Sequence, residues 1–127
     1  MNKFDRIANA SGISVDYIDL PISGSLSVPG HIALDHRFTW DSPERTVRLA
    51  HELGHCETGA FYSMDADSLT VARCERRADK WAIHHMVSAD DLRKAARAGC
   101  DSLWALADHF GITEDYVEKA IALYFGS

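Results

Sequence analysis

The chain has 127 residues, of which 46% are hydrophobic and 25% are charged, and this length and balance fit one globular domain and exclude global disorder. Its formal net charge of −6 gives no reason to expect general binding to nucleic acids. No apolar run is long enough to span a membrane, and three cysteines without CxxC spacing favour a reducing cytoplasm over a disulfide framework.

The N-terminal third of the chain predicts one helix and three short strands. A helix over residues 2–11 has its apolar side chains on one side and stops at Gly12. Apolar residues then alternate over 13–17, as they do in a strand. Two further β-like runs at 26–28 and 32–34 are separated by a Pro-Gly turn signal.

The remainder predicts helices. Ser42, Pro43 and Glu44 supply a capping hydroxyl, a first-turn proline and an acidic residue near the positive helix end. Five helices are expected in this remainder, over residues 42–59, 68–87, 88–99, 102–110 and 114–124. The predicted fold is therefore α+β: a small three-stranded sheet packed against five or six helices. We expect one domain over 1–127, with the strands and two long helices in 1–87 and a helical tail in 88–127.

The first long helix carries the sequence HELGH at residues 51 to 55. Histidines at positions 51 and 55 lie one above the other on a helix, so both imidazoles can reach one metal ion. Glu52 lies about 100° round the helix from His51, where its carboxylate can accept a proton from water. In a chain with seven histidines, the alternative is a chance match in a buried amphipathic helix, so a third ligand is needed.

The second long helix offers that ligand. On a helical projection Glu75 and Asp79 share a face with apolar residues, which predicts that both carboxylates point into the core. Burying unpaired carboxylates is costly unless a metal or strong donors compensate. We therefore predict zinc on His51, His55 and Glu75, with an open fourth position, and Asp79 as a hydrogen-bond acceptor for a ligand histidine. The alternative is that Glu75 pairs with Arg76 or Arg77 on a solvated face.

HExxH followed by ExxxD on a second helix resembles the gluzincin arrangement of thermolysin-like peptidases. The fuller resemblance is to the ImmA/IrrE family of small bacterial and phage metallopeptidases. It is carried by RLAHELGH at 48–55 and by ERRADKWA at 75–82, with weaker support from GISVDYIDLP at 12–21 and from LADHFGITEDYVEKAI in the helical tail. Many relatives continue the second metal helix with an apolar Leu-Leu-Met-Pro type segment, whereas residues 83–87 here read IHHMV.

The resemblance implies a zincin-like core, zinc on His51, His55 and Glu75, and Glu52 as the general base of peptide hydrolysis. It also implies the biological role of cutting a helix-turn-helix repressor of a phage or mobile element. The competing interpretation is a metal-stabilised antirepressor that sequesters its partner without cutting it. Tyr62, His84 and His85 are candidates for stabilising the tetrahedral oxyanion, but each is equally compatible with an exposed side chain.

The C-terminal segment has the spacing of a helix-turn-helix, which raises direct DNA binding as a further alternative. From residue 101 onward, however, five acidic residues face a single basic one, Lys119, so we expect no direct DNA binding. We expect the apolar residues of this segment to be core, and the set comprises Leu103, Leu106, Phe110, Ile112, Val117 and Leu123.

Two further groups of residues have open roles. The basic set Arg73, Arg76, Arg77 and Lys80 is expected to form a solvated helix face, or to dock an acidic partner. Cys56 and Cys74 flank the predicted ligands in sequence, and we interpret both as packing residues rather than ligands, because adjacent helix positions diverge by about 100°.

Overall fold

The computed structural model describes residues 2–20 and 24–126. Its elements are α1 (Lys3–Ala10), β1 (Ser14–Ile18), β2 (Ser25–Val28), β3 (His31–Asp35), α2 (Pro43–Thr58), α3 (Ser68–Met86), α4 (Ala89–Arg97), α5 (Leu103–Phe110) and α6 (Glu114–Phe125). The α+β prediction is confirmed. Pro21, at the end of the segment 12–21 that resembles the family's first strand, lies outside the described residues.

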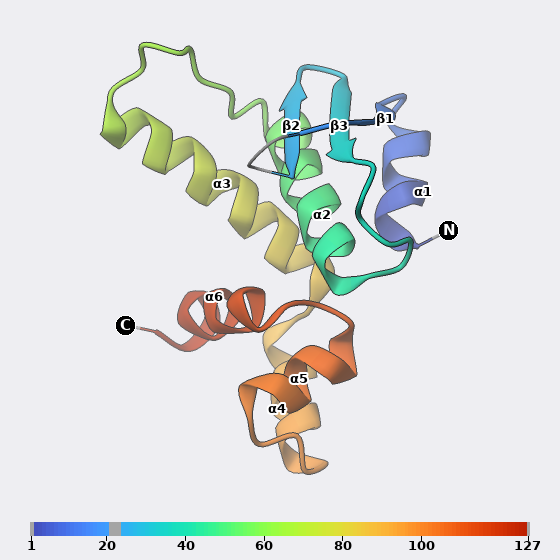
Figure 1. The fold of residues 1–127 in the computed structure, drawn as a ribbon. Helices are drawn as coiled ribbons and strands as arrows, with labels where there is room; N and C mark the ends of the chain where they lie inside the picture. Colours follow the sequence, from blue (N-terminus) through green and yellow to red (C-terminus); the bar gives the residue numbers. More distant parts are fainter. Residues whose placement is uncertain (1, 21–23, 127) are drawn as a thin grey trace.

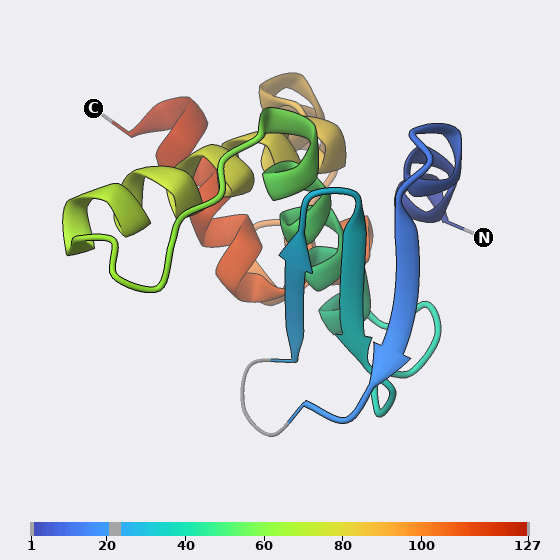
Figure 2. The same cartoon turned by 90° about the horizontal axis from the view of Figure 1, so that it is seen from above.

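The three strands form a mixed sheet in the order β1-β3-β2. β1 pairs with β3 in parallel, and β2 pairs with β3 antiparallel. Because side chains alternate between the two faces of a strand, the register Ser25↔Leu34 and Ser27↔Ile32 places both serines on the face that carries buried Leu34 and Ile32. That face packs on α2, and β2 lies at the edge nearer to α3 (Figure 2).

The helix ends follow the capping signals in the sequence. The Ser42 side chain accepts a hydrogen bond from the Arg45 backbone at 3.1 Å, and α2 stops before Gly59, whose φ of 70° is left-handed. Ser88 and Asp91 form the expected capping box of α4. The first helix is capped by Asn2 and Asp5, and it is held to α2 by a buried ion pair between Asp5 and Arg45, with Nη2–Oδ1 at 2.8 Å.

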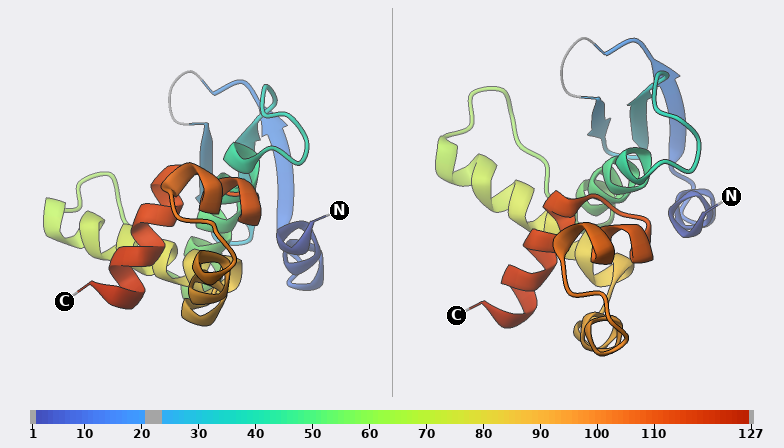
Figure 3. Two further views of the ribbon diagram at one scale, coloured as in Figure 1. Left: turned by 90° about the horizontal axis from the view of Figure 1, so that it is seen from below. Right: turned by 60° about the horizontal axis from the view of Figure 1, so that its bottom comes forward.

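The two long helices, α2 and α3, cross beside the sheet, and α4, α5 and α6 pack below them (Figures 1 and 3). Gly54 makes the crossing close, because a Cβ at this position would overlap the backbone carbonyl of Ala78 and lie 2.9 Å from its Cα. The first ten residues of α3 extend beyond the core and none of them is buried.

Each helix of the tail contributes buried side chains to the core. Tyr116, Val117 and Ala120 are buried, as are Leu106 and Ile112. Leu123 is 37% exposed, so its assignment to the core was wrong; Ile121 and Tyr124 are the residues of this part of α6 that pack against the core. Within the described part of the chain, no helix is both long enough and apolar enough to span a membrane.

Candidate metal centre

The structure brings together the three residues predicted to bind a metal. One potential ligand atom from each of His51, His55 and Glu75 lies within 4.8 Å of the others. His55 Nε2 is 2.7 Å from Glu75 Oε2, and His51 Nε2 is 3.2 Å from Glu75 Oε1. The two Nε2 atoms are 3.2 Å apart. Two helices thus direct three donor atoms to one point.

The other nitrogen of each imidazole is held by a neighbour. His55 Nδ1 lies 2.6 Å from the carbonyl oxygen of Ala60, just beyond the end of α2. His51 Nδ1 lies 2.8 Å from Asp79 Oδ1. A carbonyl and a carboxylate accept hydrogen bonds only, so each Nδ1 donates to its neighbour, and each Nε2 would present a lone pair to a cation held between it and Glu75. Two facing lone pairs beside a carboxylate make a site suited to a cation.

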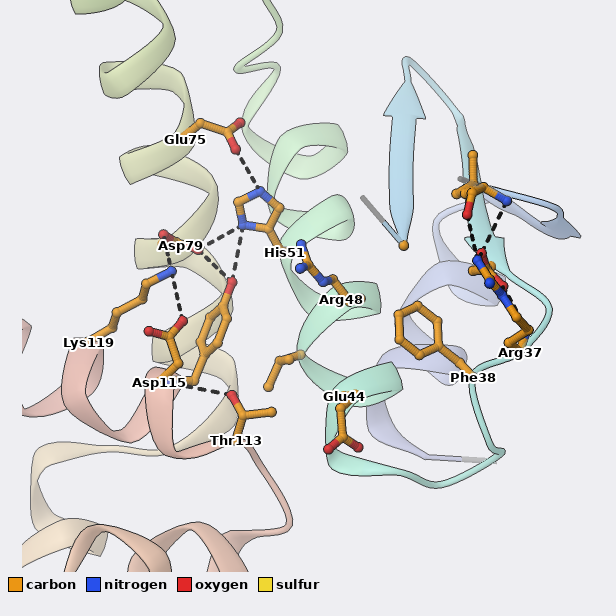
Figure 4. Close-up of a pocket in the computed structure, with 15 residues that line it drawn as sticks. Arg37, Phe38, Glu44, Arg48, His51, Glu75, Asp79, Thr113, Asp115 and Lys119 are labelled. Carbon is orange, nitrogen blue, oxygen red and sulfur yellow. Dashed lines mark hydrogen bonds and ion pairs between the residues drawn. The ribbon is translucent and has the colours of Figure 1, made fainter. Parts of the chain in front are cut away.

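Glu75 and Asp79 reach this point from α3 (Figure 4). Their side chains are 40% and 20% exposed, so they face a cleft between α2 and α3 rather than the core that the helical projection predicted. Both side chains line the larger of two cavities beside α2, which leaves them open to solvent. Arg73, Arg76, Arg77 and Lys80 face solvent, as expected.

Tyr116 of α6 completes the surroundings of Asp79. Its hydroxyl donates a 2.6 Å hydrogen bond to Asp79 Oδ1 and lies 3.2 Å from His51 Nδ1. Lys119 Nζ approaches Asp79 Oδ2 at 3.3 Å. The role of Tyr116 could not be predicted from the sequence, because no local pattern connects a residue in the tail with a histidine 65 positions earlier.

The surroundings of Asp79 favour the ionised form of its carboxyl group over the protonated form. Burial alone would raise the pKa of the Asp79 carboxyl, but hydrogen bonds from His51 and Tyr116 outweigh it and lower the pKa to about 2. Burial likewise opposes protonation of His51, yet the hydrogen bond and charge of Asp79 raise its pKa. Burial and the charge of Asp79 raise the pKa of Tyr116, so its hydroxyl keeps the proton that it donates.

Glu52 is buried on the sheet side of α2, with 6% of its surface exposed. Two hydroxyls of β2 hold it: Ser25 Oγ is 2.8 Å from Oε2, and Ser27 Oγ is 2.6 Å from Oε1. Neither serine was identified from the sequence. The signal, alternate serines in a short strand, becomes meaningful only once the strand is known to pack on α2.

The three candidate ligands, His51, His55 and Glu75, are called the ligand cluster below. Two cavities border it, and both are lined by Arg48, His51 and Glu75. A cavity of about 390 Å³ separates the cluster from β2 and includes Glu52 and Tyr62. A larger cavity of about 730 Å³ extends toward α6 and the start of α2 (Figure 4).

Of the other residues considered from the sequence, Tyr62 lies beside the three candidate ligands, and the two histidines of α3 make their contacts elsewhere. The Tyr62 hydroxyl lies 3.4 Å from Glu75 Oε2, beside the cluster, and burial together with the charge of Glu75 raises the pKa of Tyr62. His84 instead contacts Tyr124, and His85 stacks on Trp81. The Cys56 and Cys74 thiols point to backbone carbonyls of Val28 and Phe61.

Comparison with protein families gives a match over residues 12–122, to the family Peptidase_M78, whose model is described as the IrrE N-terminal-like domain. The matched segment includes every residue of the ligand cluster as well as Glu52, Asp79 and Tyr116. Searches among curated proteins and among solved structures gave no match.

Proposed function

The chain belongs to the Peptidase_M78 family, with its IrrE N-terminal-like domain, and from that premise we propose that it is a zinc-dependent endopeptidase acting on one regulatory protein. One observation carries the proposal. Two imidazole Nε2 atoms and a carboxylate converge within 4.8 Å, while the buried Glu52 follows His51 on the same helix. A metal site and an adjacent base are the two parts that metal-assisted hydrolysis requires.

The donor set supports zinc as the ion. Two neutral imidazoles and one carboxylate are a common catalytic set for zinc, which leaves a fourth position open for water or substrate. Hard cations such as magnesium or calcium favour sites made of oxygen ligands. His51, His55 and Glu75 would hold the ion, and Asp79 and Ala60 would orient the two imidazoles. A bound zinc ion supplies Lewis-acid chemistry toward a carbonyl group and lowers the pKa of water.

The protein's own residues account for proton transfer. Glu52 accepts the proton of the attacking water and delivers it to the nitrogen of the leaving amine when the C–N bond breaks. Tyr62 keeps its proton and stands 3.4 Å from the ligand carboxylate of Glu75. It is therefore our candidate for donating a hydrogen bond to the oxyanion, whereas the contacts of His84 and His85 lie elsewhere.

The sheet supports an extended substrate. β2 pairs with β3 on one side, and within the described residues no strand pairs with its other edge, which borders the cavity beside the ligand cluster. An extended peptide can add to such an edge through main-chain hydrogen bonds. A peptide bound there would run between β2 and the metal ligands, so its carbonyls would pass near Glu52.

For the substrate we propose a helix-turn-helix repressor of a phage or mobile element, on the ground of the resemblance carried by RLAHELGH and ERRADKWA. Because such repressors act in the cytoplasm, the proposed reaction takes place there. We further propose that 1–127 acts as one domain, since α6 supplies contacts to His51 and Asp79.

The test has two parts. The repressor encoded nearest this gene is co-expressed with the wild type, Glu52→Gln or Glu57→Gln, and intact masses are recorded. Glu57 is an exposed glutamate on the same helix and serves as the matched control. We expect fragments that sum to the repressor with the wild type and Glu57→Gln, and none with Glu52→Gln.

Other outcomes have definite meanings. An intact repressor that co-purifies with all three proteins favours the sequestering antirepressor. If the repressor is neither cut nor bound, the zinc-loaded proteins are incubated with a mixed peptide digest of a bacterial lysate. New peptide termini that require Glu52 would then retain the peptidase and reject the repressor, and their absence would reject the peptidase.

A further inference from the structure

We propose that Ser25 and Ser27 are positioning residues for Glu52, so that the edge strand that would bind the substrate also fixes the general base beside it. The inference rests on the proposed peptidase function and assigns a role to two residues of β2 that no sequence motif marks. It concerns how the base is held, and it is separable from whether the three ligands bind zinc.

The hydrogen bonds are specific to the two carboxylate oxygens. Ser25 Oγ donates to Oε2 at 2.8 Å, and Ser27 Oγ donates to Oε1 at 2.6 Å. One donor on each oxygen fixes the rotation of the carboxylate plane as well as its position, which a single donor would not do. A carboxylate oxygen has two lone pairs, so each oxygen keeps one that can accept a proton from water.

Burial explains why the donors matter. Glu52 is 6% exposed and Ser25 is also 6% exposed. Within the described part of the chain, no lysine or arginine forms an ion pair with Glu52, and the two serine hydroxyls are the hydrogen-bond donors found on its carboxylate. A buried carboxylate without donors is costly. Without these hydroxyls the side chain would turn toward the cavity and its water.

The strand geometry makes the arrangement a property of β2 itself. Residues 25 and 27 point toward α2 because side chains alternate along a strand, while Leu26 and Val28 are 45% and 52% exposed on the opposite face. Two successive inward positions lie about 6.6 Å apart along a strand, enough to reach the two oxygens of one carboxylate from either side. A slip of one residue in register would replace both hydroxyls by Leu26 and Val28.

The same strand contributes the edge that borders the cavity. A peptide that pairs with this edge takes its position from the backbone of β2, and Glu52 takes its position from side chains of β2. The distance from base to scissile carbonyl is therefore set within one strand of four residues. Positioning of this kind affects the rate of the chemical step more than it affects binding.

The test compares Ser25→Ala, Ser27→Ala and the double variant with Ser14→Ala. Ser14 lies on β1 at the far edge of the sheet and loses an exposed hydrogen bond to His31, so it controls for the general loss of a serine contact in this sheet. Ser27→Thr, which keeps a hydroxyl, is the rescue variant. Kinetics use a peptide cut by the wild type, zinc affinity is measured by chelator competition, and crystal structures show the Glu52 carboxylate.

We expect kcat to fall roughly 10-fold to 100-fold in the double variant, with KM and zinc affinity changed less than 2-fold. Ser27→Thr should recover most of the loss from Ser27→Ala, and Ser14→Ala should match the wild type. In the crystal structure of the double variant the Glu52 carboxylate should leave its present position.

Unchanged kcat in the double variant, or a Glu52 carboxylate that stays in place without the hydroxyls, would overturn the inference. A fall in kcat that is matched by a fall in zinc affinity would also overturn it, because the serines would then act through the ligand cluster. If the wild type cuts nothing, the proposed peptidase fails, and the crystal structure of the double variant still decides whether the serines position Glu52.

Discussion

The Tyr116 hydroxyl donates a 2.6 Å hydrogen bond to Oδ1 of Asp79, the same oxygen that lies 2.8 Å from His51 Nδ1. One carboxylate oxygen therefore connects a side chain of the helical tail with a candidate ligand on α2. Tyr116 is itself buried. The tail is thus joined to the candidate metal centre by a specific polar contact in addition to apolar packing.

Tyr116→Phe should weaken zinc binding roughly 10-fold and lower the free energy of unfolding by about 1.5–3 kcal/mol, the range for hydrogen bonds to charged groups. The matched control is Tyr124→Phe, which removes a hydroxyl that donates to the Val87 carbonyl away from the ligands. It should leave zinc affinity unchanged. Chelator competition and urea unfolding measure the two quantities, and equal zinc affinity in both variants would contradict the coupling.

Zinc should stabilise the protein against heat. On the proposal that the ion binds the folded chain at the cluster of His51, His55 and Glu75, zinc at 100 times its Kd should add about 2.7 kcal/mol. His55→Ala should lose this gain, while His109→Ala, which removes an exposed histidine on α5, should keep it. Differential scanning calorimetry with and without zinc gives the comparison. A gain retained by His55→Ala would place the metal elsewhere.

Gly54→Ala should destabilise the protein in spite of the better helix propensity of alanine, which favours the variant by about 1 kcal/mol. The added Cβ overlaps the Ala78 backbone, and a backbone cannot turn aside as a side chain can. Overpacking of this kind costs about 1–3 kcal/mol, so α2 and α3 must separate. Urea unfolding should show a net loss, with Glu57→Ala on the same helix near neutral.

Arg45→Ala should be among the most destabilising single changes. Arg45 is 1% exposed and donates to both oxygens of Asp5 at 3.1 and 2.8 Å. Its removal leaves a buried carboxylate unpaired, which costs about 3–5 kcal/mol. Lys94→Ala, which breaks an exposed pair with Asp90 on one helix, should cost about 0.3–0.5 kcal/mol. Denaturant midpoints of the two variants would then be clearly separated.

The metal-free protein should lose stability as the pH falls from 4 to 2. The pKa of Asp79 is about 2 in the folded chain, against an ordinary value of 3.8, so the unfolded chain binds more protons in this interval and stability rises with pH through it. The contribution is about 1 kcal/mol for a partly exposed group. Asp79→Asn should reduce this slope, and urea unfolding at several pH values in the presence of a chelator measures it.

Local signals predicted the helices well. The start of α2 is set by Ser42 and Pro43 and its end by Gly59, and α4 begins at the capping box of Ser88 and Asp91. These ends could be predicted because capping depends on residues within one turn. The convergence of His51, His55 and Glu75 could also be predicted, since helical periodicity fixes the spacing on each helix. Their assignment as ligands stays a prediction.

The rest depends on contacts that are distant in sequence. The order β1-β3-β2 has no local signal, so the serines facing Glu52 could not be identified before the strands were placed. Tyr116 was not singled out from the sequence, although its hydroxyl reaches Asp79. Leu123 was assigned to the core from its hydrophobicity alone, but it is 37% exposed, while Tyr124 on the same turn of α6 packs against the core.

The contact between Tyr116 and Asp79 also orders events during synthesis. A ribosome translates the two serines of β2, the HELGH helix and the carboxylates of α3 well before it reaches Tyr116, which follows His51 by 65 residues. A nascent chain therefore holds every candidate ligand before it holds the hydroxyl that braces Asp79. The candidate metal centre therefore lacks the hydrogen bond from Tyr116 to Asp79 until α6 has docked.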